Sequence, residues 1–154
     1  MLASGAAGPS FQLKDTQGRP WRSSELLESG PVLLFFFKIS CPVCQLIAPF
    51  MERLSKSSAM QVVGISQDNA ASTKAFNGRF GLTLPVLLDE SKAGYPASNQ
   101  FGITSVPSLF LIEADDKIST AFSGFSKADI VALSERAGVD VFKPGEQVPA
   151  FRAG

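Results

Sequence analysis

VLLFFFKISCPVC, residues 32–44, decides the fold of this chain. Its first six residues, 32–37, form a continuous apolar run in which apolar and polar side chains do not alternate. Such a run is typical of a strand that is buried on both faces, at the centre of an α/β sheet. Two cysteines follow after a short connection, Cys41 first and Cys44 second. The stretch therefore predicts a buried strand that leads directly into a cysteine-containing segment.

A helix is predicted immediately after this strand, over residues 42–58. Its apolar residues recur at helical spacing; they are Val43, Ile47, Phe50, Met51 and Leu54. Pro49 lies inside the helix, where it removes one backbone donor and is expected to bend the helix axis. The cysteine pair is therefore expected at the start of a helix, at the end of the buried strand.

The rest of the chain alternates strands and helices, with turn residues between them. Residues 11–14 and 19–22 flank a turn and predict an N-terminal β-hairpin, which a short capped helix over residues 23–28 follows. Further strands are predicted at residues 61–66, 84–88, 108–112 and 118–122, and further helices at residues 70–80, 95–101 and 126–137. This order predicts an α/β fold in which helices flank a mixed central sheet and the hairpin is an addition at the N-terminus.

Length and composition indicate one folded domain. The chain has 154 residues, of which 45% are hydrophobic and 18% charged, which is enough to form a substantial core. We expect the domain to span residues 9–138, after a flexible N-terminus at residues 1–8. Residues 139–154 contain several prolines and glycines and no hydrophobic period, so they predict an irregular C-terminal tail.

Charge and composition exclude several functional classes. Basic and acidic residues balance at 14 each and no long basic run is present, so nucleic acid is not an expected partner. The chain has no histidine, which excludes Ser-His-Asp and Cys-His catalysis and imidazole metal sites. No apolar stretch approaches the roughly 18 residues of a membrane span, and no signal peptide is recognised. We expect a cytoplasmic protein, or a periplasmic or otherwise extracytoplasmic one whose export signal has been removed.

The two cysteines carry the chemistry expected of this chain. Cys41 and Cys44 are separated by two residues at a predicted helix start, where they can close a small disulfide ring. The unsatisfied N–H groups of a helix N-terminus favour a thiolate at Cys41, whereas Cys44 lies one turn further in and is shielded. We therefore expect Cys41 to be the attacking nucleophile and Cys44 the resolving thiol, with no cofactor.

Three other roles for the pair have weaker support. A zinc site needs four ligands, and the chain has neither further cysteines nor histidines to complete one. A purely structural disulfide would close so short a loop that it would remove little entropy from the unfolded chain. The third alternative is two inert core residues, which the position at a helix start argues against.

Several segments resemble the thioredoxin superfamily. Residues 35–44, with the helix-interior Pro49, resemble the active-site segment of that superfamily. One branch of the superfamily is shared by ResA- and TlpA-like thiol oxidoreductases and alkyl hydroperoxide reductase/thiol-specific antioxidant proteins. Its members are similar to this chain at residues 11–20, 80–89 and 101–108. The resemblance covers about residues 9–137. It implies a thioredoxin-like fold and a cis Pro107 that packs against the cysteines. It also implies that substrate polypeptide binds at Pro42, Val43, Val106 and Pro107, where an extended segment can pair with the Val106 backbone.

The sequence departs from that family at three positions around the cysteines. Ser40 stands where many members have tryptophan, and Phe35 stands where many have a buried acid that accepts the proton of the second cysteine. Lys38 either points toward the Cys41 thiolate or is a solvated loop residue, and the sequence supports both interpretations equally.

Two functions of different classes follow from the resemblance. The leading one is a monomeric thiol-disulfide oxidoreductase that exchanges disulfides with protein disulfide or dithiol substrates. The alternative is a peroxiredoxin-type thiol peroxidase with Cys41 as the peroxidatic cysteine. Against it, peroxiredoxins carry proline and threonine or serine where this chain has Leu34 and Lys38, and they use an arginine that is missing between Arg79 and Arg136. A third possibility, a copper carrier, has weaker support, because such proteins usually need a histidine beside the thiolates and this chain has none.

Overall fold

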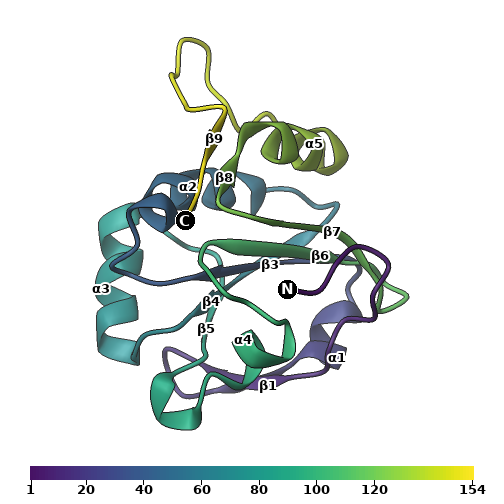
Figure 1. Cartoon of the computed structure of the whole chain (residues 1–154), viewed down its shortest axis with the longest axis vertical. Helices are drawn as coiled ribbons and strands as arrows, with labels where there is room; N and C mark the ends of the chain where they lie inside the picture. Colours follow the sequence, from purple (N-terminus) through teal and green to yellow (C-terminus); the bar gives the residue numbers. More distant parts are fainter.

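A computed structural model describes all residues from 1 to 154 (Figure 1). The strands are β1 Gln12–Asp15, β2 Pro20–Arg22, β3 Val32–Phe37, β4 Gln61–Ser66, β5 Val86–Leu88, β6 Ser108–Ile112, β7 Ile118–Ser123, β8 Phe125–Ser126 and β9 Phe151–Arg152. The helices are α1 Ser23–Leu27, α2 Pro42–Leu54, α3 Ala70–Phe80, α4 Pro96–Gln100 and α5 Lys127–Ala137, with a short 3-10 helix at Ser91–Ala93. No helix combines the length and the apolar character needed to cross a membrane.

Seven strands form one mixed sheet in the order β2-β1-β5-β4-β3-β6-β7. Strands β3, β4 and β5 are parallel, whereas β1, β2, β6 and β7 join antiparallel to their neighbours. The hairpin of β1 and β2 extends the sheet beyond β5, as the sequence predicts for an added N-terminal hairpin. The expected mixed α/β fold is thereby confirmed.

Strand β3 separates two apolar cores, because its side chains point alternately to the two faces of the sheet. Leu33, Phe35 and Phe37 belong to the larger cluster, which α2, α3 and α5 cover. The neighbouring residues of the strand face the smaller cluster, under α1, α4 and the N-terminal segment. All six residues of β3 are buried, which confirms the prediction from the continuous apolar run.

Several element ends differ from the sequence-based expectation. Helix α2 ends at Leu54, where its apolar positions end, and β5 begins at Val86, after Pro85, which has no N–H to donate. Helix α1 lacks the expected side-chain cap, because its N-cap residue is Arg22, whose side chain has no hydrogen-bond acceptor. The hydroxyl of Ser23 instead accepts a hydrogen bond from the Phe11 N–H at 3.0 Å. The N-terminal residues also make tertiary contacts, since the Leu2 N–H donates to the Phe101 carbonyl at 2.9 Å.

Asp15 closes the hairpin that the sequence predicts. One of its carboxylate oxygens accepts from the backbone N–H groups of Gln17 at 2.8 Å and Arg19 at 3.0 Å. The other accepts from Trp21 Nε1 at 3.0 Å and Arg19 Nε at 3.1 Å. Burial by itself would raise the pKa of Asp15, but these hydrogen bonds outweigh it and lower the pKa to about 2.

Replacing Asp15 is expected to lower the free energy of unfolding and to reduce the part of it that is lost in acid. Because the folded-state pKa lies below the unfolded value, ionised Asp15 stabilises the fold above about pH 4, and this stabilisation disappears as the pH falls toward 2. We expect Asp15→Asn to cost about 1–2 kcal/mol at neutral pH and less at pH 2, measured by urea unfolding. The exposed turn substitution Asp115→Asn is the control, and equal losses for the two variants would contradict this role.

Candidate active site

The two cysteines lie at the end of β3, where α2 begins. Cys41 is the N-cap residue of α2, and Pro42 is the first residue of the helix. The Cys41 sulfur accepts a hydrogen bond from the Cys44 backbone N–H at 3.2 Å, which satisfies one of the free donors of the first turn. Both cysteines are free thiols. The expected place of the pair at a helix start is confirmed.

A second segment reaches the cysteines because β6 pairs antiparallel with β3. The pair Phe36↔Ser108 places the beginning of β6 beside the end of β3. The Cys41 thiol consequently donates to the Val106 carbonyl at 3.4 Å, across 65 positions of sequence. The Val106–Pro107 peptide bond is cis, as the family resemblance implied. Val106 is half-buried and Pro107 buried.

Cys44 is enclosed in the larger core. Its exposed fraction is 0%, and it shares the apolar cluster with Phe35, Val43 and Ile47. Burial, with a further contribution from the hydrogen bond to Cys41, raises the pKa of the Cys44 thiol far above its ordinary value. At neutral pH Cys44 is therefore a protonated, shielded thiol beside the accessible Cys41.

Two polar side chains that the sequence did not single out hold the loop before Cys41. Asp68 Oδ2 accepts from the Ile39 backbone N–H at 2.8 Å, and Gln45 Nε2 donates to the Ile39 carbonyl at 2.9 Å. Asp68 comes just after β4, whose last residue, Ser66, pairs with Phe37 at the end of β3. The only sign of this role in the sequence is an acidic residue just after the strand that pairs in parallel with β3. The partner of Asp68 is a backbone N–H, so no pattern of side chains predicts the contact.

The other residues expected at the site differ in accessibility. Pro42 is exposed beside Cys41, whereas Val43 is only 6% exposed and packs in the core. Lys38 is exposed and lines a hollow of about 490 Å³ together with residues from the ends of β4 and β5. The remaining lining residues are Gln67, Asp68, Asn69, Glu90, Ser91, Lys92 and Tyr95. The structure thus brings Cys41, Cys44, Pro42 and Val106 together and directs Val43 inward.

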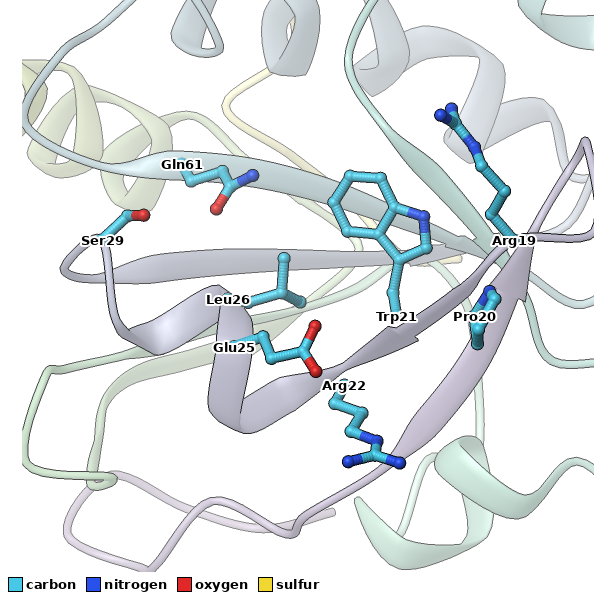
Figure 2. Close-up of a pocket in the computed structure, with 8 residues that line it drawn as sticks. All are labelled: Arg19, Pro20, Trp21, Arg22, Glu25, Leu26, Ser29 and Gln61. Atoms are coloured by element: carbon cyan, nitrogen blue, oxygen red, sulfur yellow. The ribbon is translucent and has the colours of Figure 1, made fainter.

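A different cavity lies on the hairpin, away from the cysteines (Figure 2). It measures about 380 Å³ and is lined by Arg19, Pro20, Trp21, Arg22, Glu25, Leu26, Ser29 and Gln61. Ser29 precedes β3 and Gln61 begins β4, so the cavity lies at the end of the sheet opposite to Cys41. The guanidinium groups of Arg19 and Arg22 point apart in Figure 2, so they do not converge on one anion.

Comparison with known proteins places this geometry in a family. The model of the AhpC/TSA family matches residues 4–121. The chain belongs to the AhpC/TSA family. The matched residues include the hairpin, both cysteines and the Val106–Pro107 segment, so the family assignment rests on the same elements as the site.

Individual relatives of this AhpC/TSA member carry two kinds of name. Thiol-disulfide oxidoreductase ResA of Geobacillus thermodenitrificans is 31% identical over 134 residues, which cover 84% of this chain and 75% of that protein. Chloroplastic peroxiredoxin Q of Sedum lineare is 33% identical over 109 residues, 68% of this chain and 56% of that protein. The crystal structure of a thiol:disulfide interchange protein of the thioredoxin family from Chlorobium tepidum has a TM-score of 0.70 and 28% identity, and covers 89% of this chain and 99% of that one. The thioredoxin-like fold is therefore established.

The positions of Cys41 and Cys44 in this AhpC/TSA member predict a large difference in reactivity between the two thiols. We expect iodoacetamide at neutral pH to label Cys41 of the reduced protein at least tenfold faster than Cys44, because Cys44 is fully buried and its pKa is raised. Peptide mapping by mass spectrometry after short labelling times measures both rates. Urea-unfolded protein is the control, in which the two rates should become similar; comparable rates in the folded protein would contradict the assignment.

Proposed function

We propose that this protein is a thiol-disulfide oxidoreductase in which Cys41 attacks and Cys44 resolves. The observation that carries the proposal is the asymmetry of the pair: Cys41 is accessible at the N-terminus of α2, and Cys44 is buried directly behind it. A helix N-terminus stabilises a thiolate, which is the attacking species in the forward exchange and the leaving group when the exchange runs in reverse. The family and the names of the ResA relatives support the same reaction class.

The reaction proceeds by two exchanges at sulfur. The Cys41 thiolate attacks one sulfur of a substrate disulfide, which forms a mixed disulfide and releases the other substrate sulfur as a thiolate. Cys44 then attacks the Cys41 sulfur, so that the substrate leaves as a dithiol and the protein keeps a Cys41–Cys44 disulfide. Two electrons pass to the substrate in this direction, and the oxidised protein runs the same steps backwards on a substrate dithiol.

Protein disulfides or dithiols are the substrates that we propose. The Val106 carbonyl lies beside the Cys41 sulfur, and the neighbouring Pro42 is exposed, so an extended polypeptide can bind along this part of the surface. Pro107, which follows Val106 through a cis peptide bond, is buried. Val43 is enclosed in the core, and we assign it to positioning the first turn of α2 rather than to contact with substrate.

The proton of Cys44 has no acidic acceptor in its apolar surroundings. Phe35 is 0% exposed and belongs to the same cluster as Cys44, at the position where many relatives carry an acid. We therefore infer that the thiolate released from the substrate takes this proton, directly or through water that reaches the mixed disulfide. The protons balance, because one thiol proton of the released dithiol comes from Cys44 and the other comes from solvent, which took up the proton of Cys41 when it ionised.

Peroxidase activity is the second candidate, and the peroxiredoxin Q relative is the observation that favours it. In that reaction peroxide would oxidise Cys41 to a sulfenic acid. The thiol of Cys44 would then condense with this sulfenic acid to form the disulfide and water. The residues around Cys41 fit it less well, because Lys38 replaces the expected hydroxyl side chain. Two arginines are also engaged elsewhere: Arg53 pairs with Glu146 and Arg136 pairs with Glu113.

One pair of assays separates the two functions. Reduction of the interchain disulfides of insulin by the wild-type protein, with dithiothreitol as electron donor, tests the first. Consumption of hydrogen peroxide with the same donor, followed by stopped flow, tests the second. We expect insulin reduction well above the uncatalysed rate and peroxide consumption no faster than that of a free thiol, with Cys41→Ser as the inactive control. Rapid peroxide turnover without insulin reduction would reverse the assignment.

A further inference from the structure

The segment after α5 is docked on the domain by several side chains. Val141 is fully buried, and the Phe142 ring lies 5.0 Å from the Phe50 ring of α2. The guanidinium of Arg53 donates to the Val141 carbonyl at 2.6 Å and to both carboxylate oxygens of Glu146, at 2.7 and 3.0 Å. These contacts fix the start of the segment to the same helix that carries the cysteines.

The segment then turns back and adds a strand. In β9, Phe151 pairs with Ser126 and Arg152 with Phe125 of β8, and just before it the Ala150 carbonyl accepts from the Lys127 N–H at 3.0 Å. Gly124 leaves room for this strand: its φ is +77°, and a Cβ there would lie 2.6 Å from the Arg152 carbonyl oxygen. Figure 1 shows the yellow end of the chain running down beside β8 and ending near α2.

The last residue lies against the active-site backbone. A Cβ added at Gly154 would overlap the Val106 carbonyl oxygen and would lie 3.0 Å from Pro107 Cδ. The same carbonyl accepts the hydrogen bond of the Cys41 thiol at 3.4 Å. The end of the chain and the reactive sulfur therefore meet at one backbone group.

We propose that residues 151–154 are an intramolecular occupant of the substrate surface, which a substrate polypeptide must displace before it reaches Cys41. This inference rests on the proposed function, because it concerns access to the surface beside the Val106 backbone. The segment competes with substrate, and the fraction of molecules in which it is detached sets the apparent affinity for substrate.

The structure gives such an occupant the two properties that it needs. Residues 151–154 are all exposed, Phe151 by 61%, and only two residue pairs join β9 to β8, so little is lost when they detach. The upstream contacts of Arg53 and Phe142 remain in place during that movement and keep the detached end near the site, at a high effective concentration.

The occupant also indicates which substrate segment fits. It is extended, it pairs with the edge of β8, and it places a glycine where the Val106 carbonyl leaves no room for a side chain. We therefore infer that preferred substrates present an extended, exposed segment with glycine at the position that faces Val106.

Removal of the occupant tests the proposal. A variant that ends at Ala150 keeps the Arg53–Glu146 pair and the hydrogen bond between Ala150 and Lys127, and loses only exposed residues. We expect kcat/KM for insulin reduction to rise at least threefold, mainly through KM. Arg152→Pro should do the same at full length because proline is a poor fit to a paired strand, whereas the matched control Arg152→Lys should behave as wild type. Equal kcat/KM in all four proteins would overturn the proposal.

A second measurement keeps the proposal separate from the proposed function. The alkylation rate of Cys41 by a bulky maleimide needs no enzymatic turnover, and it should rise at least threefold in the shortened and Arg152→Pro proteins. Iodoacetamide, which is small, should respond less. If no protein reduces insulin, the proposed function fails, and the maleimide rates still decide the role of residues 151–154. Unchanged maleimide rates would overturn that role even in an active enzyme.

Discussion

Replacing Cys44 by serine is expected to turn the protein into a trap that stays covalently bound to its substrate. Attack on a disulfide needs only the accessible Cys41 at the start of α2, which this variant retains. Release needs a second thiol held next to the mixed disulfide, and the serine hydroxyl cannot supply it. We expect turnover of insulin to fall at least a thousandfold. When the pre-reduced variant is mixed with insulin in the absence of dithiothreitol, which would cleave the product, a mixed disulfide should accumulate to about one equivalent, as measured by non-reducing electrophoresis and mass spectrometry.

Cys41→Ser is the matched control for the trap. It keeps one thiol, but that thiol is the fully buried Cys44, whose pKa is raised, so no mixed disulfide should form. Under the peroxidase alternative, Cys44→Ser would instead consume one equivalent of peroxide rapidly and accumulate a sulfenic acid at Cys41. Trapping through Cys44 in the Cys41→Ser variant would show that the roles of the two thiols are reversed.

The sequence predicts most of the fold because its strongest signals are local. Strands β3, β4 and β6 and helix α3 begin and end at the predicted residues. In β3 the cause is a continuous apolar run. In α3 the Asn69 side chain caps the start, and Gly81, in the left-handed conformation, ends the helix. The prediction for α2 runs four residues too far, because it extends past Leu54, the last of the apolar positions that mark the helix.

The interactions that the sequence does not reveal are those between distant segments. The Ser23 hydroxyl accepts a hydrogen bond from the Phe11 N–H, twelve positions earlier, a contact that depends on how the hairpin packs. Asp68 holds the loop before Cys41 through a backbone N–H, so its partner has no side-chain signature. Strand β9 is only two residues long and exists because β8 offers an edge, so the tail carries no strand pattern of its own.

Around the cysteines, the resemblance supplied what residue patterns alone could not. The cis bond before Pro107 has no local signature, and its contact with Cys41 depends on the pairing of β3 with β6. Phe35, in contrast, departs from the family, and the structure shows how the fold accommodates it. Its ring lies 5.0 Å from the Phe37 ring in the core behind Cys44, so an apolar side chain fills the place of the missing acid.

Truncation of Phe36 is expected to have the largest effect on stability. Its side chain is completely buried on the face of the sheet away from the cysteines, with ring centroids 5.3 Å from Phe101 and 5.8 Å from Phe110. Phe36→Ala removes these contacts and leaves a cavity that rigid strands cannot close. We expect the free energy of unfolding to fall by about 3–5 kcal/mol in urea titrations, with an unchanged slope against denaturant.

Two further variants show whether this loss comes from packing at the centre of the sheet. Phe36→Leu keeps most of the volume and should cost less than about 2 kcal/mol, because the core can repack around a branched aliphatic side chain. Phe151→Ala removes the same atoms from a residue that is 61% exposed and should leave the free energy of unfolding within about 0.5 kcal/mol. A loss below about 1 kcal/mol for Phe36→Ala would mean that β3 does not organise the smaller core. The order Phe36→Ala, Phe36→Leu, Phe151→Ala therefore tests the reading of residues 32–37 as the strand on which both cores are built.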